Sequence, residues 1–115
     1  MSISFDLFTF RTKFKGGDKV KDVMALCWAA YQGDLEEIQR LVACGVNLNE
    51  ADYDGRTCIH LAGSEGKLDV VKFLIGQEIN MFPKDRWGGT PLDDAKRHGH
   101  TEIIKILKTK EENNE

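Results

Sequence analysis

Hydrophobic residues recur along most of the chain at the spacing of short amphipathic helices. Leu68, Val71 and Leu74 lie three residues apart, and Ile103 and Leu107 follow one face of a later segment. Apolar residues at every third or fourth position form a stripe that faces a core. Small residues and then a glycine precede each stripe, so the pattern predicts pairs of short helices joined by turns.

The pattern repeats with a period of 33 residues. The matching positions are Gly55 with Gly88, Thr57 with Thr90, Ala62 with Ala95, and Gly66 with Gly99. Self-similarity at such a period is typical of stacked helical or turn-and-helix units. We expect three repeats, at about residues 19–51, 52–84 and 85–110, preceded by an N-terminal arm (1–18) and followed by a polar tail (111–115).

The second and third units begin with turn signals, "DYDG" and "DRWGG". Thr57 and Thr90 follow these turns, and a threonine hydroxyl there can accept from a free backbone N–H of the next helix. Pro91 follows Thr90, at the first helical position, where the missing N–H of proline costs nothing. Each unit is therefore expected to be a turn, a helix, a second turn and a second helix.

Two hexapeptides carry a family resemblance. "TCIHLA" (57–62) and "TPLDDA" (90–95) resemble the T-P-L-H-x-A signature of the ankyrin repeat. The resemblance implies an all-α ankyrin-repeat solenoid of three helix-turn-helix repeats with β-turn fingers. It also implies structural roles for Thr57, His60, Thr90 and Pro91, with His60 bonded to the threonine and to nearby backbone.

A longer segment, "NMFPKDRWGGTPLDDAKRHGH", is similar to the C-terminal ankyrin segment of glutaminases. "DYDGRT" also occurs in ankyrin regions attached to other proteins, including plant potassium channels. No glutaminase catalytic domain is found in these 115 residues, so the resemblance transfers no enzymatic residue.

Charge and cysteine content exclude several classes of function. The net charge is −3; residues 1–21 carry five basic and two acidic side chains, so the remainder carries −6 and does not suit nucleic acid. Cys27, Cys44 and Cys58 lack the spacing of a zinc site or a disulfide framework. We find no apolar run of membrane-spanning length and no secretory leader, and expect a cytoplasmic protein with no membrane partner.

Three groups of residues could carry chemistry. Cys58 with His60 could form a thiol site, His98 and His100 could hold a metal weakly at a turn, and "DYDG" has the acidic character of a calcium loop. The first pair lies inside the repeat signature, the histidines lack a third ligand, and the closing glutamate of a calcium loop is absent. We therefore expect no catalytic residue, no metal, no cofactor and no small-molecule substrate.

Aromatic and basic residues point instead to a binding surface for another protein. By resemblance to the family, Trp28 and Tyr31 line the concave groove, and the fingers along its rim carry four further candidates, Tyr53, Arg56, Arg86 and Trp87. Tyr, Trp and Arg dominate interface hot spots. Two alternatives stay open: Trp28 could cover the end of a capping repeat, and the chain could be a regulatory or assembly segment acting on a separate glutaminase-like catalytic chain.

The N-terminal arm stands outside the repeats. It contains Phe5, Phe8, Phe10 and Phe14 among basic residues, which is too apolar for a simple solvated tail. Three interpretations remain: it covers the end of the first repeat, it mediates partner binding or self-association, or it is a membrane-surface or targeting segment.

Overall fold

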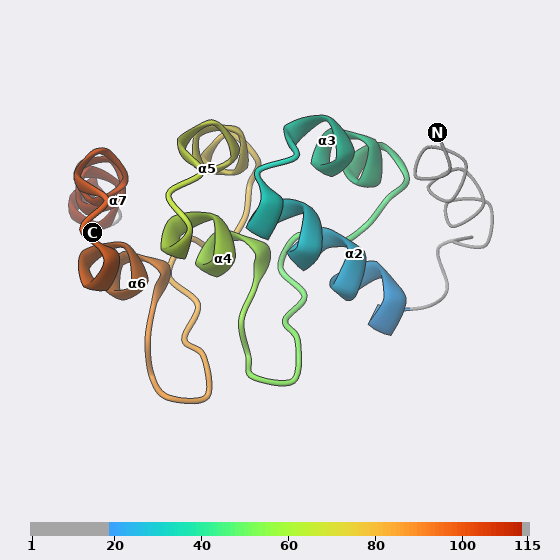
Figure 1. Ribbon diagram of the computed structural model, residues 1–115, viewed down its shortest axis with the longest axis horizontal. Helices are drawn as coiled ribbons and strands as arrows, with labels where there is room; N and C mark the ends of the chain where they lie inside the picture. The colour runs from blue at the N-terminus through green and yellow to red at the C-terminus, as the bar shows by residue number, and fades with distance from the viewer. Residues whose placement is uncertain (1–18, 114–115) are drawn as a thin grey trace.

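The computed structural model describes residues 19–113, and within them six helices form an all-α arrangement without strands. The helices are α2 (Lys19–Gln32), α3 (Leu35–Ala43), α4 (Cys58–Ser64), α5 (Leu68–Ile75), α6 (Pro91–His98) and α7 (Thr101–Asn113). They stack as three pairs, with α2, α4 and α6 forming an inner row and α3, α5 and α7 an outer row (Figure 1). The expected solenoid of three helix-turn-helix repeats is confirmed.

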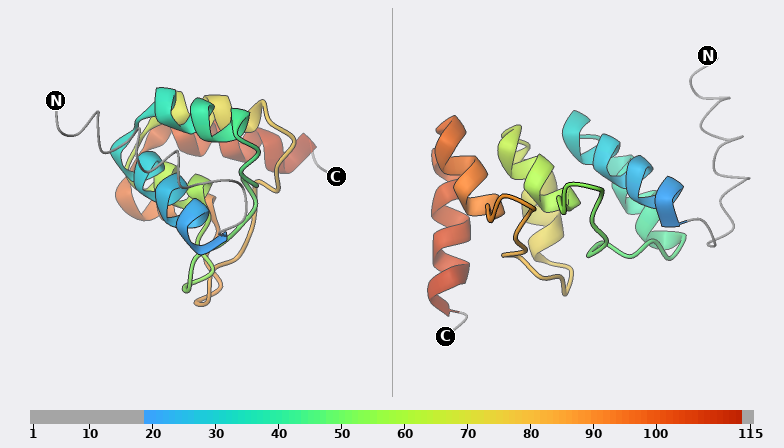
Figure 2. Two further views of the ribbon diagram at one scale, coloured as in Figure 1. Left: turned by 90° about the vertical axis from the view of Figure 1, so that its right-hand side faces the viewer. Right: turned by 90° about the horizontal axis from the view of Figure 1, so that it is seen from below.

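Two long loops project beside the inner row, one before α4 and one before α6 (Figures 1 and 2). We call residues 50–57 the first finger and residues 83–90 the second finger. A backbone hydrogen bond of 2.9 Å closes each finger, from Asp52 N to Arg56 O and from Asp85 N to Gly89 O. The two bonds are one repeat apart, so the fingers share one backbone turn geometry.

The hydrophobic core lies between the two rows. Its fully buried aliphatic members include Leu26, Ile38, Leu41, Ile59, Val70, Val71, Leu74, Ile103 and Leu107. Small residues line the junctions between inner helices: a Cβ on Gly63 would lie only 3.3 Å from the carbonyl oxygen of Pro91. Because Ala30, Ala62 and Ala95 are also fully buried, neighbouring repeats approach closely and share one continuous core.

Glycines between the paired helices are required for two reasons. Gly66 has a φ of +72°, the left-handed region that residues with a Cβ avoid. A Cβ on Gly66 would also lie 2.7 Å from Cε1 of His100, and one on Gly33 would lie 2.8 Å from Cδ of Lys67. In both cases the covering side chain belongs to the following repeat, at the position just after that repeat's own glycine.

The ends of the chain differ from the simple repeat. The expected N-terminal arm, with its four phenylalanines, lies outside the described residues. At the other end, α7 runs to Asn113, beyond the boundary expected at residue 110. Among residues 19–113, no helix is long and apolar enough to cross a bilayer.

Candidate functional site

Each finger is held in shape by an aspartate at its base. One carboxylate oxygen of Asp85 accepts from the backbone N–H of Trp87 at 2.9 Å and of Gly89 at 2.8 Å. Asp52 does the same for Asp54 and Arg56 in the first finger, at 2.9 and 3.0 Å. Desolvation alone would raise the pKa of Asp85, but the amide hydrogen bonds from Gly89 and Trp87 outweigh it and lower that pKa below its ordinary value.

The fingertips expose two aromatic side chains on a fixed backbone. Tyr53 is 93% exposed and Trp87 is 70% exposed. Arg86 joins the fingers, because its backbone N–H donates to the carbonyl of Asp54 at 2.7 Å and its guanidinium lies 3.2 Å from the Asp54 carboxylate. The same guanidinium lies 5.3 Å from the centroid of the Trp87 ring, a cation–π geometry.

The inner face of the first repeat carries an apolar hollow. Trp28 and Tyr31 stack on α2 with ring centroids 5.6 Å apart and an interplanar angle of 15°. They border a hollow of about 550 Å³ whose lining residues are Met24, Cys27, Trp28, Tyr31, Asp52 and Leu61. We call this the apolar hollow; it spans α2, the base of the first finger and α4.

The third repeat presents charged side chains at the corresponding place. Asp94 is 1% exposed; one of its oxygens accepts from Arg56 at 2.8 Å, and the other forms an ion pair with Arg97 at 3.1 Å. A second hollow of about 290 Å³ lies beside this group, lined by Arg56, Asp85, Trp87, Gly89, Asp94 and Arg97. Arg56, expected on the finger rim, is thus anchored to the next repeat by a largely buried ion pair.

His60 connects the second repeat to the second finger. Its Nδ1 accepts from the backbone N–H of Thr57 at 3.0 Å, so the neutral ring carries its proton on Nε2. That Nε2 lies 3.0 Å from the carbonyl oxygen of Gly89 and donates to it. Thr90 caps α6 in the third repeat, where its hydroxyl accepts from Asp93 N at 3.2 Å and Pro91 begins the helix.

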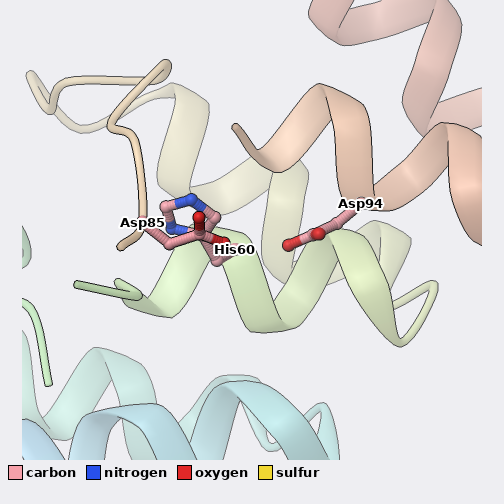
Figure 3. Close-up of side chains that lie close together, drawn as sticks. All are labelled: His60, Asp85 and Asp94. Atoms are coloured by element: carbon pink, nitrogen blue, oxygen red, sulfur yellow. The ribbon is translucent and has the colours of Figure 1, made fainter. Parts of the chain in front are cut away.

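The structure brings His60, Asp85 and Asp94 together, with potential ligand atoms within 4.8 Å of one another (Figure 3). Several of their lone pairs already have partners. His60 uses Nδ1 for Thr57 and has a proton on Nε2, Asp94 is bound by two arginines, and Asp85 accepts from backbone amides. Because a metal ligand must offer a free lone pair, these contacts indicate a structural role for the three side chains between the second and third repeats.

Two of the cysteines are unsuited to nucleophilic chemistry. Desolvation by burial raises the pKa of Cys27 and of Cys58 from 9.0 to about 12, so both are neutral thiols at physiological pH. The Cys58 sulfur lies 3.6 Å from the carbonyl oxygen of Leu48. The only lone pair of the His60 ring faces Thr57, so His60 does not offer a base to Cys58.

Two structural residues were missed by sequence reasoning. His100 Nε2 donates to the carbonyl of Ser64 at 2.9 Å, so this ring does more than flank a turn beside His98. The Cys27 sulfur lies 4.0 Å from Arg56 O, the contact that corresponds, one repeat earlier, to that of His60 with Gly89 O. The 33-residue period could have indicated the Cys27 contact, because Cys27 and His60 are 33 positions apart.

Comparison with known proteins agrees with this architecture. A family model described as ankyrin repeats (3 copies) matches residues 23–115. The chain is similar to "Glutaminase liver isoform, mitochondrial" of Rattus norvegicus, with 46% identity over 53 residues that cover 45% of this chain and 9% of that protein. It is also similar to "Potassium channel GORK" of Arabidopsis thaliana, with 46% identity over 41 residues that cover 36% of this chain and 5% of the channel.

A third relative is "L-asparaginase" of Dirofilaria immitis, with 46% identity over 41 residues that cover 36% of this chain and 7% of that protein. The matched part spans less than a tenth of each of these three proteins. The names of these three proteins describe different activities, so this partial similarity assigns none of them to this chain.

Proposed function

Because this chain belongs to the ankyrin repeat family, we propose that it binds a segment of another protein through its inner row and fingers. Ankyrin repeats are generally protein–protein interaction modules. One observation supports the surface in particular: the large hydrophobic side chains most exposed among residues 21–112 are Met24, Trp28, Tyr31, Tyr53 and Trp87, all on α2 or a fingertip.

Exposed aromatic side chains on a fixed scaffold favour binding, because burying them against a partner releases free energy. Trp28 is 61% exposed on α2. Aromatic anchors of this kind contribute most of the binding free energy at interfaces. Because the Asp52 and Asp85 hydrogen bonds already fix the fingers, little conformational entropy is lost on binding.

The charges near this surface favour a protein partner over nucleic acid. Arg86 is paired with Asp54, and Arg56 with Asp94, so these arginines do not form an extended basic surface. Nucleic-acid binding requires a concentrated positive surface that releases counterions. We propose a non-enzymatic module without a cofactor, and a cytoplasmic location in which the free thiols of Cys27, Cys44 and Cys58 stay reduced.

A second candidate function rests on the glutaminase resemblance. The 46% identity over 53 residues favours a regulatory or assembly segment that acts on a separate catalytic chain. Co-purification of a glutaminase activity with the tagged full chain would support this alternative. A set of co-purified proteins without such an activity would leave the general interaction module as the better description.

The test of the proposed function compares captured proteins between variants. The tagged full chain, a Trp28→Ala and Trp87→Ala double variant, and a Lys108→Ala control would each be incubated with the same cell extract. Lys108 is exposed on α7 in the outer row, away from the fingers. Proteins retained by the parent and by the control but lost from the double variant would support the surface; identical retention by all three would contradict it.

A further inference from the structure

The inner row changes its chemistry from one repeat to the next. Tyr31, Ser64 and Arg97 occupy equivalent positions, 33 residues apart, on α2, α4 and α6. Trp28, Leu61 and Asp94 are likewise equivalent. A partner crossing the three helices therefore meets an aromatic stack first, then small and aliphatic side chains, and finally a group of charged ones.

Four charged side chains line the hollow at the third repeat, Arg56, Asp85, Asp94 and Arg97, and Arg97 is the most exposed of them. Arg97 is 62% exposed and Arg56 24% exposed, whereas the Asp94 carboxylate between them is only 1% exposed. Asp94 thus holds two guanidinium groups in place while its own charge stays inside. The Arg56 Nε atom is buried and has no hydrogen-bond partner among the described residues. We call Arg56 and Arg97 the arginine pair.

The second repeat, in the middle of the inner row, would repel a carboxylate of the partner. Glu65 is exposed at the end of α4, between the equivalent positions Gln32 and His98. A carboxylate of the partner placed over the second repeat would be repelled by Glu65, whereas one placed over the third repeat would meet the arginine pair. Charge complementarity therefore restricts where an acidic residue of the partner can lie.

Resting on the proposed function, we propose that the partner is an extended peptide segment with two features. An apolar side chain enters the apolar hollow beside Trp28 and Tyr31, and a carboxylate binds the arginine pair. The apolar hollow lies between α2 and α4, and the arginine pair lies between the first finger and α6, so one to two helix spacings separate the subsites. Adjacent packed helices lie about 8–10 Å apart, which gives a separation of roughly 8–20 Å. An extended chain advances about 3.3 Å per residue, so the two anchors are about three to six residues apart.

The probe is a library of random 12-residue peptides displayed on phage and selected on the immobilised full chain. Parallel selections would use Arg97→Gln, Tyr31→Ala and the outer-row control Lys105→Gln. One selected sequence would then be synthesised, together with versions in which its acidic residue is moved to two residues from the apolar anchor or replaced by an amide. Binding of each peptide to the full chain would be measured by fluorescence anisotropy.

The expected result is an enriched pattern of an apolar residue and Asp or Glu about three to six positions apart. Moving or neutralising the acid should weaken binding to the parent about threefold to tenfold, as for a charge-assisted contact at a partly exposed site. The Arg97→Gln variant should select the apolar residue without the acid, and Tyr31→Ala should select neither strongly. Lys105→Gln should reproduce the parental pattern.

Two other results would overturn the inference in distinguishable ways. Peptides that need Tyr31 but show no preference for an acidic residue would contradict the role of the arginine pair in binding. They would leave the proposed interaction surface intact. Failure to enrich any peptide, combined with unchanged protein capture by the Trp28 and Trp87 double variant, would contradict both this inference and the proposed function.

Discussion

The Nε2 atom of His60 lies 3.0 Å from the carbonyl oxygen of Gly89, so a side chain of the second repeat holds the base of the second finger. The other ring nitrogen accepts from Thr57 N, at the start of the same helix. One fully buried imidazole thus joins a helix start to the neighbouring repeat. This contact links the stability of the stack to the position of the finger that exposes Trp87.

We predict that His60→Ala lowers the free energy of unfolding by about 1–3 kcal/mol, because it leaves the buried backbone groups of Thr57 and Gly89 without a partner. Chemical denaturation followed by circular dichroism measures the change. Partner affinity of the folded fraction should be reduced little, since His60 is buried and cannot touch a partner. An unchanged stability with lost binding would instead place His60 in a binding site.

A matched pair of glycines tests the packing between repeats. Gly66 and Gly99 share a φ of +72°, but a Cβ on Gly66 would clash with His100, whereas one on Gly99 meets nothing within 4 Å. Gly99→Ala should cost about 1–2 kcal/mol for the left-handed backbone alone. Gly66→Ala should cost at least about 1 kcal/mol more, because the His100 ring is held by Ser64 and cannot easily move away.

Equal losses of stability in the two alanine variants would contradict that packing. They would show that the His100 ring moves aside freely, and that its hydrogen bond to the Ser64 carbonyl contributes little. The comparison uses thermal or chemical unfolding of both variants at one pH, with the parent chain as reference.

The cysteines should differ in their reactivity. Cys44 is exposed, so a maleimide at pH 7 should label it quickly, while Cys27 and Cys58 should react only as the protein unfolds. Mass spectrometry of the native protein would show one fast addition among the three thiols. Rapid labelling of Cys58 would revive the thiol-site hypothesis.

The raised pKa values of Cys27 and Cys58 predict that the folded protein becomes less stable in alkali. Their pKa values are raised from 9.0 in the unfolded chain to about 12 in the folded protein. Below pH 9 both states hold the protons and stability is complete; above it the unfolded chain releases them first, so unfolding becomes more favourable up to about pH 12. A Cys27→Ala and Cys58→Ala double variant should show a smaller decline over this range.

The sequence predicted the repeat architecture because backbone requirements recur with the period. Gly66 and Gly99 need a positive φ, and Thr57 and Thr90 begin helices, so they recur 33 residues apart. Contacts between repeats were harder to predict. Arg56 was expected to lie on the finger rim, yet it reaches Asp94, 38 residues away, because its side chain is long enough to cross to the next inner helix.

His100 was missed for a similar reason. Its equivalent position in the second repeat is Lys67, a residue of different chemistry, so no motif marks the site. Each side chain covers the glycine of the preceding repeat, Gly33 for Lys67 and Gly66 for His100. Of the two, only the imidazole also donates to a carbonyl of the neighbouring helix, that of Ser64. Such contacts depend on the stagger between repeats, which the period alone does not give.

The central claim is that exposed aromatics on the inner row and fingers bind the partner, and Trp87 tests it most directly. Trp87 is 70% exposed on a fingertip whose backbone is held by Asp85, so Trp87→Ala should leave the thermal midpoint nearly unchanged. If Trp87 is an anchor, its removal costs about 2 kcal/mol or more and weakens binding at least roughly 30-fold.

The measurement is the Kd of the captured partner for the parent chain, Trp87→Ala and the outer-row control Lys108→Ala, by calorimetry at one salt concentration. We predict a Kd at least about 30-fold higher for Trp87→Ala and an unchanged Kd for Lys108→Ala. If both variants bind like the parent, the contact surface lies elsewhere, and the phenylalanine-rich arm of residues 1–18 becomes the leading candidate.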